Sequence, residues 1–320
     1  MKGFMRSTVF VLACSFALPC CAQAYPTRPI HMLVGIAPGG GLDSGARLVA
    51  AKVSEVLGQS VIVENRPGAG GTIAAAAVAA APPDGYTLQY AAGSLLISPS
   101  LYKKLSFDPV KSFTPVAGVG WEPLVLVVNP AVPAKTTAEL IALLKANPGK
   151  YSYGSPGIGS VHHLAMEMFR TQAGVNIVHV PYKGAALYLP DLITGVLPLA
   201  IASVASSLPQ AKAGKLRAIA LSRPIKLAIA PDWPTLAETL PGFDASPSFF
   251  ILAPTGTPAN VVARLSEALK TAVSADDLKR SFQAQGATAE FVPPDVLAGW
   301  IQVEVRKWNA VAQESGAKLE

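Results

Sequence analysis

Short apolar runs alternate with segments in which apolar residues recur at helical spacing. The first run covers residues 30–36, and from Asp43 the apolar positions fall on one helical face until Gly58 ends the helix. Further apolar runs at 60–65 and 86–92 flank an alanine-rich segment at 72–81. This strand–helix alternation predicts a mostly parallel sheet whose strands are joined by crossover helices.

A second series of the same kind begins with the fully apolar run at 123–130. The pattern predicts helices at 136–146, 160–171 and 185–194, and strands at 151–154, 176–180, 197–202 and 216–221. It then predicts a returning strand at 248–254, helices at 258–272 and 275–284, a strand at 288–292 and a last helix with an apolar stripe. Two rounds of one architecture predict two α/β lobes, with the chain crossing between them near 119–125 and 247–253.

The first 24 residues have the features of a secretory signal peptide. Lys2 and Arg6 form a basic start, an apolar run covers 7–18, and small residues at Ala22 and Ala24 fit a cleavage site before Tyr25. A lipid anchor at Cys14 stays open as a weaker alternative. All three cysteines lie in this segment, so the mature chain would have no disulfide, thiolate catalyst or cysteine-ligated metal.

Composition and charge favour a globular protein that binds an anion. Of the 320 residues, 51% are hydrophobic and 14% are charged, which excludes a disordered chain. Removing Lys2 and Arg6 with the leader lowers the formal charge from +6 to +4, a mild positive balance that suits acidic ligands. The sequence has no basic cluster typical of nucleic-acid binding and no metal-binding motif, so neither nucleic acid nor metal is expected.

A glycine loop joins the first predicted strand to the first predicted helix. It runs Pro38-Gly39-Gly40-Gly41, and Asp43 is expected to cap the helix. Glycines allow a ligand to reach the free N–H groups of a helix N-terminus, which attract anions. Three consecutive glycines exceed what a turn needs, which favours ligand contact over a plain turn. The G-x-x-x-G-x-G spacing is weak evidence for a dinucleotide, and no Y-x-x-x-K pair accompanies it, so no cofactor is expected.

A second loop of this kind covers residues 153–163. Ser155 and Ser160 have hydroxyls suited to a carboxylate, and His163 is expected to hydrogen-bond the loop or the ligand. A secreted serine hydrolase using Ser155 or Ser160 is the alternative, although the G-x-S-x-G spacing is absent. Lys183 follows the strand at 176–180 and either attracts an acid or is a solvated loop charge.

Several longer stretches together resemble one known family, the Bug-type or TctC-type extracytoplasmic solute receptors of tripartite tricarboxylate transporters. In order from Tyr25 these are YPTRPIHMLVGIAPGGGLD, VIVENRPGAGG, PDGYTL, LYKKLSFDPVKSFTPVA, NIVHVPYKG, AGKLRAIAL and LAPTGTP. The resemblance covers essentially the whole mature chain. It implies a type II-like periplasmic-binding-protein fold, a cleft that closes on a small organic anion, membrane permease subunits as partners, a monomeric receptor and no catalysis.

The resemblance also implies lobe boundaries and site residues. Lobe one would comprise 25–119 plus 252–320, and lobe two 120–251. Ligand contacts would come from the Pro38–Asp43 loop, the Ser94 loop and the 155–163 segment, which includes Gly157, Ile158 and Gly159. Leu42, Ile158 and the pair Ala202-Ser203 stand where relatives commonly carry polar residues. These departures predict an apolar cleft that prefers aromatic or aliphatic carboxylates to amino acids.

Overall fold

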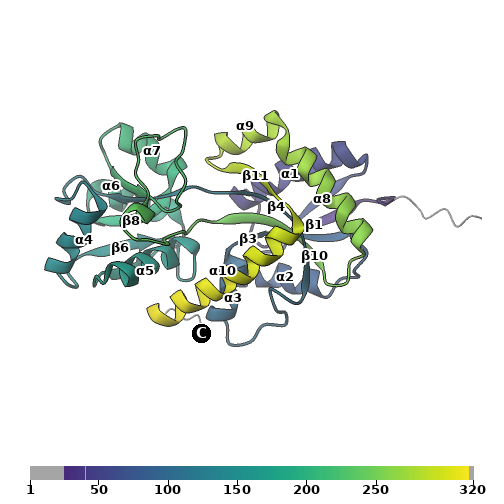
Figure 1. Cartoon of the computed structure of the whole chain (residues 1–320), viewed down its shortest axis with the longest axis horizontal. Coiled ribbons are helices and arrows are strands. Elements are labelled where there is room, and N and C mark those ends of the chain that lie inside the picture. Colours follow the sequence, from purple (N-terminus) through teal and green to yellow (C-terminus); the bar gives the residue numbers. More distant parts are fainter. Residues whose placement is uncertain (1–24, 40, 317–320) are drawn as a thin grey trace, which may run out of the picture.

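The computed structural model describes residues 25–39 and 41–316. The expected signal peptide (1–24) and Gly40 lie outside the described residues. The described chain forms two α/β lobes, one built around a six-stranded sheet and the other around a five-stranded sheet (Figure 1). This is the two-lobed architecture that the hydrophobic pattern predicts.

Lobe one contains the six-stranded sheet, in the order β11-β4-β10-β3-β1-β2. Its strands are β1 (Ile30–Val34), β2 (Val61–Asn65), β3 (Thr87–Ala92), β4 (Phe113–Trp121), β10 (Ser248–Pro254) and β11 (Thr288–Val292). The strands β1 to β4 run in one direction, whereas β10 pairs antiparallel with both β3 and β4, and β11 pairs antiparallel with β4. The sheet is therefore mixed, with most strands in one direction.

Helices cover both faces of this sheet. One apolar core joins it to α1 (Gly41–Leu57), α8 (Ala259–Ser274) and α9 (Asp276–Ala284). The other face packs on α2 (Thr72–Ala79), α3 (Ser94–Leu101) and α10 (Pro294–Ser315), with a 3-10 turn, η1 (Ala69–Gly71), before α2. The cores consist of aliphatic and aromatic side chains at the strand and helix periodicities seen in the sequence.

Lobe two contains the five-stranded sheet, in the order β7-β6-β8-β5-β9. Its elements are β5 (Leu124–Val128), α4 (Thr137–Ala146), β6 (Ser152–Ser155), α5 (Val161–Ala173), β7 (Val178–Pro181), α6 (Ala185–Thr194), β8 (Leu199–Ser203), α7 (Val204–Lys212), β9 (Arg217–Leu221) and the 3-10 turn η2 (Leu236–Glu238). Only β5 opposes the direction of the other strands described in this sheet. The helices α4 and α5 cover one face, and α6 and α7 cover the other.

The chain crosses between the lobes twice. The first crossing is short, because Glu122 and Pro123 alone separate β4 of one sheet from β5 of the other. The second crossing leads from β9 to β10, and Glu122 N donates to Pro247 O at 2.8 Å, which ties the two crossings together. The expected lobe boundaries at 119/120 and 251/252 therefore fall inside β4 and β10 rather than between the sheets.

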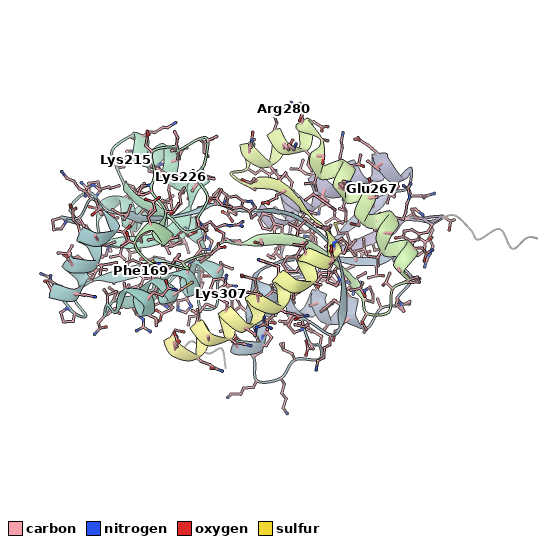
Figure 2. All side chains as sticks on the ribbon, in the orientation of Figure 1. Phe169, Lys215, Lys226, Glu267, Arg280 and Lys307 are labelled. Carbon is pink, nitrogen blue, oxygen red and sulfur yellow. The ribbon has the colours of Figure 1, made fainter. Side chains whose placement is uncertain are left out.

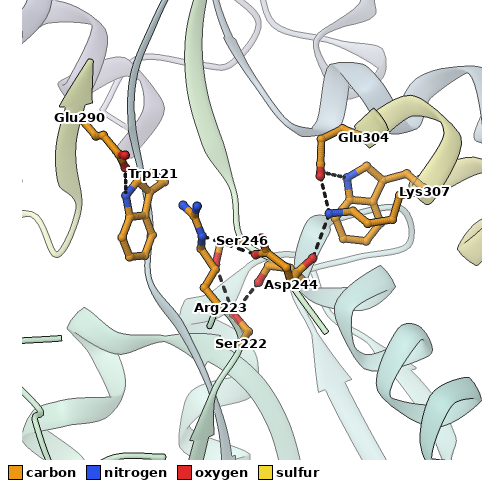
Figure 3. A network of polar contacts seen from close by, with 10 residues as sticks. Trp121, Ser222, Arg223, Asp244, Ser246, Glu290, Glu304 and Lys307 are labelled. Carbon is orange, nitrogen blue, oxygen red and sulfur yellow. Dashed lines mark hydrogen bonds and ion pairs between the residues drawn. The ribbon is translucent and has the colours of Figure 1, made fainter. Parts of the chain in front are cut away.

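Polar contacts brace the junction of the lobes (Figure 3). The guanidinium of Arg223 lies 4.3 Å above the ring of Trp121, and Trp121 Nε1 donates to Glu290 Oε2 at 2.7 Å. Lys307, where α10 passes from lobe one toward lobe two (Figure 2), donates to the backbone oxygen of Asp244 at 2.9 Å. The helix α10 contacts both α3 of lobe one and α5 of lobe two, so it joins the lobes in addition to the crossings.

The pattern did not predict the start of the first helix, the strand β4 or the helices α3 and α7. The first helix begins at Gly41, so Asp43 lies in its first turn and is not its N-cap. The helix α3 was not predicted because Pro99 interrupts it. Proline removes the N–H that would bond to the oxygen of Leu95, and Ser98 Oγ donates to that oxygen at 2.7 Å instead. The helix α7, with Pro209 inside it, was missed for a similar reason.

Candidate functional site

A cavity of about 400 Å³ lies between the two lobes. Lobe one contributes residues that follow β1 and β3, and lobe two contributes residues that follow β6, β7 and β8. Ligands of open α/β sheets bind at these carboxyl ends of the strands. The cavity is lined by Gly41, Leu42, Gly45, Ala92, Ser94, Glu122, Ser160, Val161, His162, Ala185, Ser203, Pro247, Phe249, Phe282, Gln285 and Ala287.

The N-termini of five helices meet at this cavity. Gly41 and Ser94 begin α1 and α3, Val161 and Ala185 begin α5 and α6, and Ser203 precedes α7. The ends of α3, α6 and α7 have no side-chain cap. One first-turn N–H group of each donates to a backbone oxygen, from Leu96, Leu187 and Val204, and the others keep capacity to bind a ligand. Each N-terminus also carries a partial positive charge from the helix dipole. The arrangement therefore suits an anion, with contributions from both lobes.

The glycine loop is held in place from behind by Asp43. This side chain is 3% exposed and does not line the cavity. Its Oδ2 accepts from Gly39 N at 2.9 Å, and its Oδ1 accepts from Asn65 Nδ2 at 2.8 Å. The hydrogen bond from Arg47, supported by these two, lowers the pKa of Asp43 to about 2. The structure thus gives Asp43 a different place from the one expected: its carboxylate lies behind the cavity wall, is hydrogen-bonded and fixes the loop.

In the second loop, residues 153–163, some side chains likewise hold the loop in place and others line the cavity. Ser155 is fully buried, and its Oγ lies 2.7 Å from His179 Nε2. Ser160 lines the cavity while its Oγ caps α5, accepting from His163 N at 3.1 Å and donating to Gly157 O at 2.8 Å. The structure therefore places Ser155 behind the wall, which corrects the expectation that its hydroxyl reaches a ligand.

His163 also lies behind the wall. It is 4% exposed, and its Nδ1 accepts from Gly159 N at 3.2 Å. Its ring stacks on that of His179 with 4.0 Å between centroids. Burial, with a smaller contribution from His179, lowers the pKa of His163 to about 3, so the imidazole is neutral and accepts at Nδ1. His163 thus anchors the loop, and the neighbouring His162 faces the cavity instead.

The remaining predicted residues separate into rim and core. Pro38, Gly39, Ile158 and Lys183 are exposed, and none of them is among the residues that line the cavity. Gly157 and Gly159 shape the loop before α5 with φ of 147° and 78°. Ala202 is fully buried in the core of lobe two, whereas the adjacent Ser203 lines the cavity. Ala202 therefore faces the core and not the expected cleft, because successive strand residues point to opposite faces.

Sequence reasoning missed Glu122 and His162. Both are partly buried and line the cavity, Glu122 from the first crossing and His162 from the first turn of α5. Burial lowers the pKa of His162, and the nearby Glu122 carboxylate opposes this shift. An acidic residue between two apolar strands at the expected crossing was the available signal for Glu122. The apolar residues Phe249 and Phe282, from β10 and α9, were also outside the predicted set.

A second cavity of about 170 Å³ lies near the junction, on the side of α10. Trp121, Phe250 and Trp300 give it a largely apolar lining, and its one arginine, Arg223, is already stacked on Trp121. Among the described residues, no group of three or more histidine, cysteine or acidic side chains is placed to hold a metal ion. No helix in the described part of the chain combines the length and hydropathy that a membrane span requires. We therefore place the candidate site in the interlobe cleft.

Two α/β lobes joined by two crossings, with an anion-suited cleft between them, define a solute-binding receptor of the periplasmic-binding-protein class. The chain matches the family model described as "Tripartite tricarboxylate transporter family receptor" over residues 45–317, and it belongs to this family. It is 37% identical over 315 residues to Protein BugT of Bordetella pertussis, covering 98% of this chain and 97% of that protein.

Solved structures agree in fold over nearly the whole chain. An R. palustris protein solved with adipate is 34% identical with a TM-score of 0.77, covering 92% of this chain and 100% of that one. MatC from Rhodopseudomonas palustris, solved with bound malate, is 31% identical with a TM-score of 0.74, covering 90% and 99%. Family members are solute-binding receptors and not enzymes, so the serine hydrolase alternative is not supported.

Proposed function

We propose that this protein captures a small organic carboxylate in the interlobe cleft and delivers it to the permease subunits of a tripartite tricarboxylate-type transporter. The observation that carries the proposal is the meeting of five helix N-termini at one cavity. A carboxylate placed there receives N–H hydrogen bonds and meets the positive ends of the helix dipoles. The ligands named for two similar structures, adipate and malate, are carboxylates as well.

The lining favours a ligand with an apolar body. Leu42 contributes to the wall from α1, and Phe249 and Phe282 contribute from β10 and α9. Burying apolar ligand surface against them contributes roughly 25 cal/mol per Å². An aromatic acid or an aliphatic mono- or dicarboxylate fits this environment. Because Ala202 lies in the core, it gives no reason to rank such acids above amino acids.

Close contacts between the lobes support capture by closure. A Cβ on Gly93 of lobe one would lie 3.6 Å from Cγ2 of Val161 of lobe two. A Cβ on Gly286 of lobe one would lie 2.0 Å from Cβ of Ala205 of lobe two. A ligand that bridges the helix N-termini of both lobes binds the closed form better than the open form and shifts the equilibrium toward it.

The cellular setting follows from the leader. We propose that residues 1–24 direct export, that cleavage leaves Tyr25 at the N-terminus, and that the mature receptor works as a periplasmic monomer. Tyr25 is docked on lobe one, where its hydroxyl donates to Gly85 O at 2.6 Å. Intact-mass analysis of the exported protein tests the cleavage site, and a diacylglycerol-modified Cys14 would contradict it.

A thermal-shift screen of carboxylic acids, followed by calorimetry, tests the ligand class. The screen includes aromatic acids, aliphatic mono- and dicarboxylates, amino acids and the neutral amides of the same skeletons. A ligand at 100 times its Kd stabilises the folded form by about 2.7 kcal/mol. The expected result is stabilisation by acids and not by their amides. Equal stabilisation by the amides, or by no acid at all, would contradict the proposal.

A further inference from the structure

The cleft that suits an anion also contains a carboxylate. Glu122 is the one residue with a formal charge among the described residues that line the cavity. Its position is fixed at the junction, since its backbone N–H donates to Pro247 O at 2.8 Å and the preceding residue, Trp121, is 5% exposed. The backbone at Glu122 is therefore fixed at the cavity, and its half-buried side chain forms part of the cavity wall.

The neighbours of Glu122 do not neutralise it. The cavity wall, as far as the structure describes it, contains no lysine or arginine, and Arg223 lies in the other cavity, stacked on Trp121. His162 lines the same cavity and interacts with the Glu122 carboxylate, and burial lowers the pKa of His162. His162 is therefore neutral at neutral pH, so it contributes no compensating cation.

We infer that Glu122 selects a ligand that carries a hydrogen-bond donor, a hydroxyl or an ammonium, in addition to its carboxylate. When the cleft closes, a carboxylate without a partner loses its hydration at a cost. A ligand donor replaces that hydration, and a second ligand carboxylate at the same place adds like-charge repulsion instead. The helix N-termini bind the acidic end of the ligand, and Glu122 binds the donor end.

This inference rests on the proposed carboxylate-binding function and narrows it. Among the acids considered above, monoanions with a donor group are preferred to dianions. The inference also includes acids with an amino group among the expected ligands, because Glu122 supplies the acidic partner that Ala202 does not.

Four acids on one six-carbon skeleton test the inference: hexanoate, 6-hydroxyhexanoate, 6-aminohexanoate and adipate. Their affinities are measured by calorimetry with the wild type and with Glu122→Gln. Glu267→Gln, at an exposed site on α8, is the matched control. If the broad screen finds an acid with another skeleton, the same four end groups are compared on that skeleton.

In the wild type, 6-hydroxyhexanoate or 6-aminohexanoate should bind at least about tenfold more tightly than hexanoate and adipate. This difference in affinity corresponds to about 1.4 kcal/mol. Glu122→Gln should weaken the binding of 6-aminohexanoate more than that of 6-hydroxyhexanoate, since glutamine keeps an acceptor oxygen but loses the charge. It should also strengthen adipate. The hydroxyl and amino members thus distinguish the two kinds of donor.

An unchanged ranking of the four end groups in Glu122→Gln would overturn the inference, as would tight binding of the diacid to the wild type with no gain in the variant. Either result leaves carboxylate binding itself intact. If no acid binds at all, the proposed function fails instead, so the two failures are distinguishable.

Discussion

Asp43 Oδ2 accepts a hydrogen bond from Gly39 N at 2.9 Å, so a buried side chain of α1 holds the glycine loop at the cleft. Asp43→Ala leaves the Gly39 amide, the Asn65 side chain and Arg47 without this partner. A buried polar group left unpaired costs about 1–3 kcal/mol. We expect the variant to lose stability by that order and to bind ligand more weakly, as measured by urea unfolding and calorimetry.

Two further variants test whether the loss of stability and ligand affinity is specific to the Asp43 carboxylate. Asp43→Asn keeps a side-chain oxygen for the Gly39 amide and should recover most of the ligand affinity. Asp232→Ala, at an exposed aspartate of lobe two, should change neither stability nor affinity. Full ligand affinity in Asp43→Ala would mean that the loop does not need this support.

Gly41 lines the cavity, and a Cβ at this position would meet no atom within 4 Å. Gly41→Val should therefore leave the fold intact and occupy space that the ligand needs. We expect calorimetry to show an affinity reduced about tenfold or more, that is by about 1.4 kcal/mol. Gly299→Val is the control, because it adds the same side chain at an open helical site away from the cleft. Equal affinities of the two variants would show that Gly41 does not contact the ligand.

Gly286 and Ala205 approach each other from opposite lobes, and a Cβ on Gly286 would lie 2.0 Å from Cβ of Ala205. Gly286→Val should hold the lobes apart and reduce ligand affinity. Small-angle scattering should show that added ligand no longer decreases the radius of gyration. Gly242→Val is the control, since Gly242 has a similar φ of +81° with nothing within 4 Å. Both variants lose about 1–3 kcal/mol of stability from backbone strain, but only Gly286→Val should lose closure.

The buried His163 makes stability depend on pH. Burial lowers its pKa to about 3, whereas an exposed histidine in the unfolded chain titrates near 6.5. Below pH 6.5 the unfolded chain binds a proton that the folded chain does not, so the free energy of unfolding falls as the pH falls. The slope attributable to this group is about 1.4 kcal/mol per pH unit at most, and the contribution is complete above pH 6.5.

Urea unfolding between pH 7 and pH 4.5 measures this effect. His163→Gln should have a shallower pH dependence than the wild type, because glutamine offers an uncharged acceptor to Gly159 N. Identical slopes for the wild type and His163→Gln would contradict the assignment.

Local pattern was sufficient for most of the fold and for part of the site. Apolar periodicity predicts the described strands other than β4 and most helices, and the strand–helix junctions that follow β1, β3 and β6 lead to Gly41, Ser94 and Ser160 at the cleft. These predictions succeed because the position of a loop follows from the order of elements alone. The helix α3 was missed because the hydroxyl of Ser98 compensates for Pro99, which propensity does not report.

Where the predicted site differs from the observed cavity, the predicted residue is next in sequence to one whose side chain faces the cavity. His163 was predicted, and its neighbour His162 lines the cavity; Ala202 and Ser203 were both predicted, and of these two Ser203 lines it. The side-chain direction on α5 depends on which face packs against the sheet of lobe two, and that choice is made by tertiary contacts. A sequence places these residues at the correct loop but does not resolve which neighbour faces the ligand.

The position of β10 has a consequence for how the chain folds. This strand lies between β3 and β4 although it is separated from them by the whole of lobe two. Lobe two, from β5 to β9, is continuous in sequence and can assemble from its own contacts. In lobe one, β4 cannot join β3 until β10 is available up to residue 254, and β11 comes later still, so the pairing is non-local. An N-terminal piece of the chain that ends before β10 therefore lacks the strand that joins β4 to the rest of its sheet, which suits the export through a membrane that we propose.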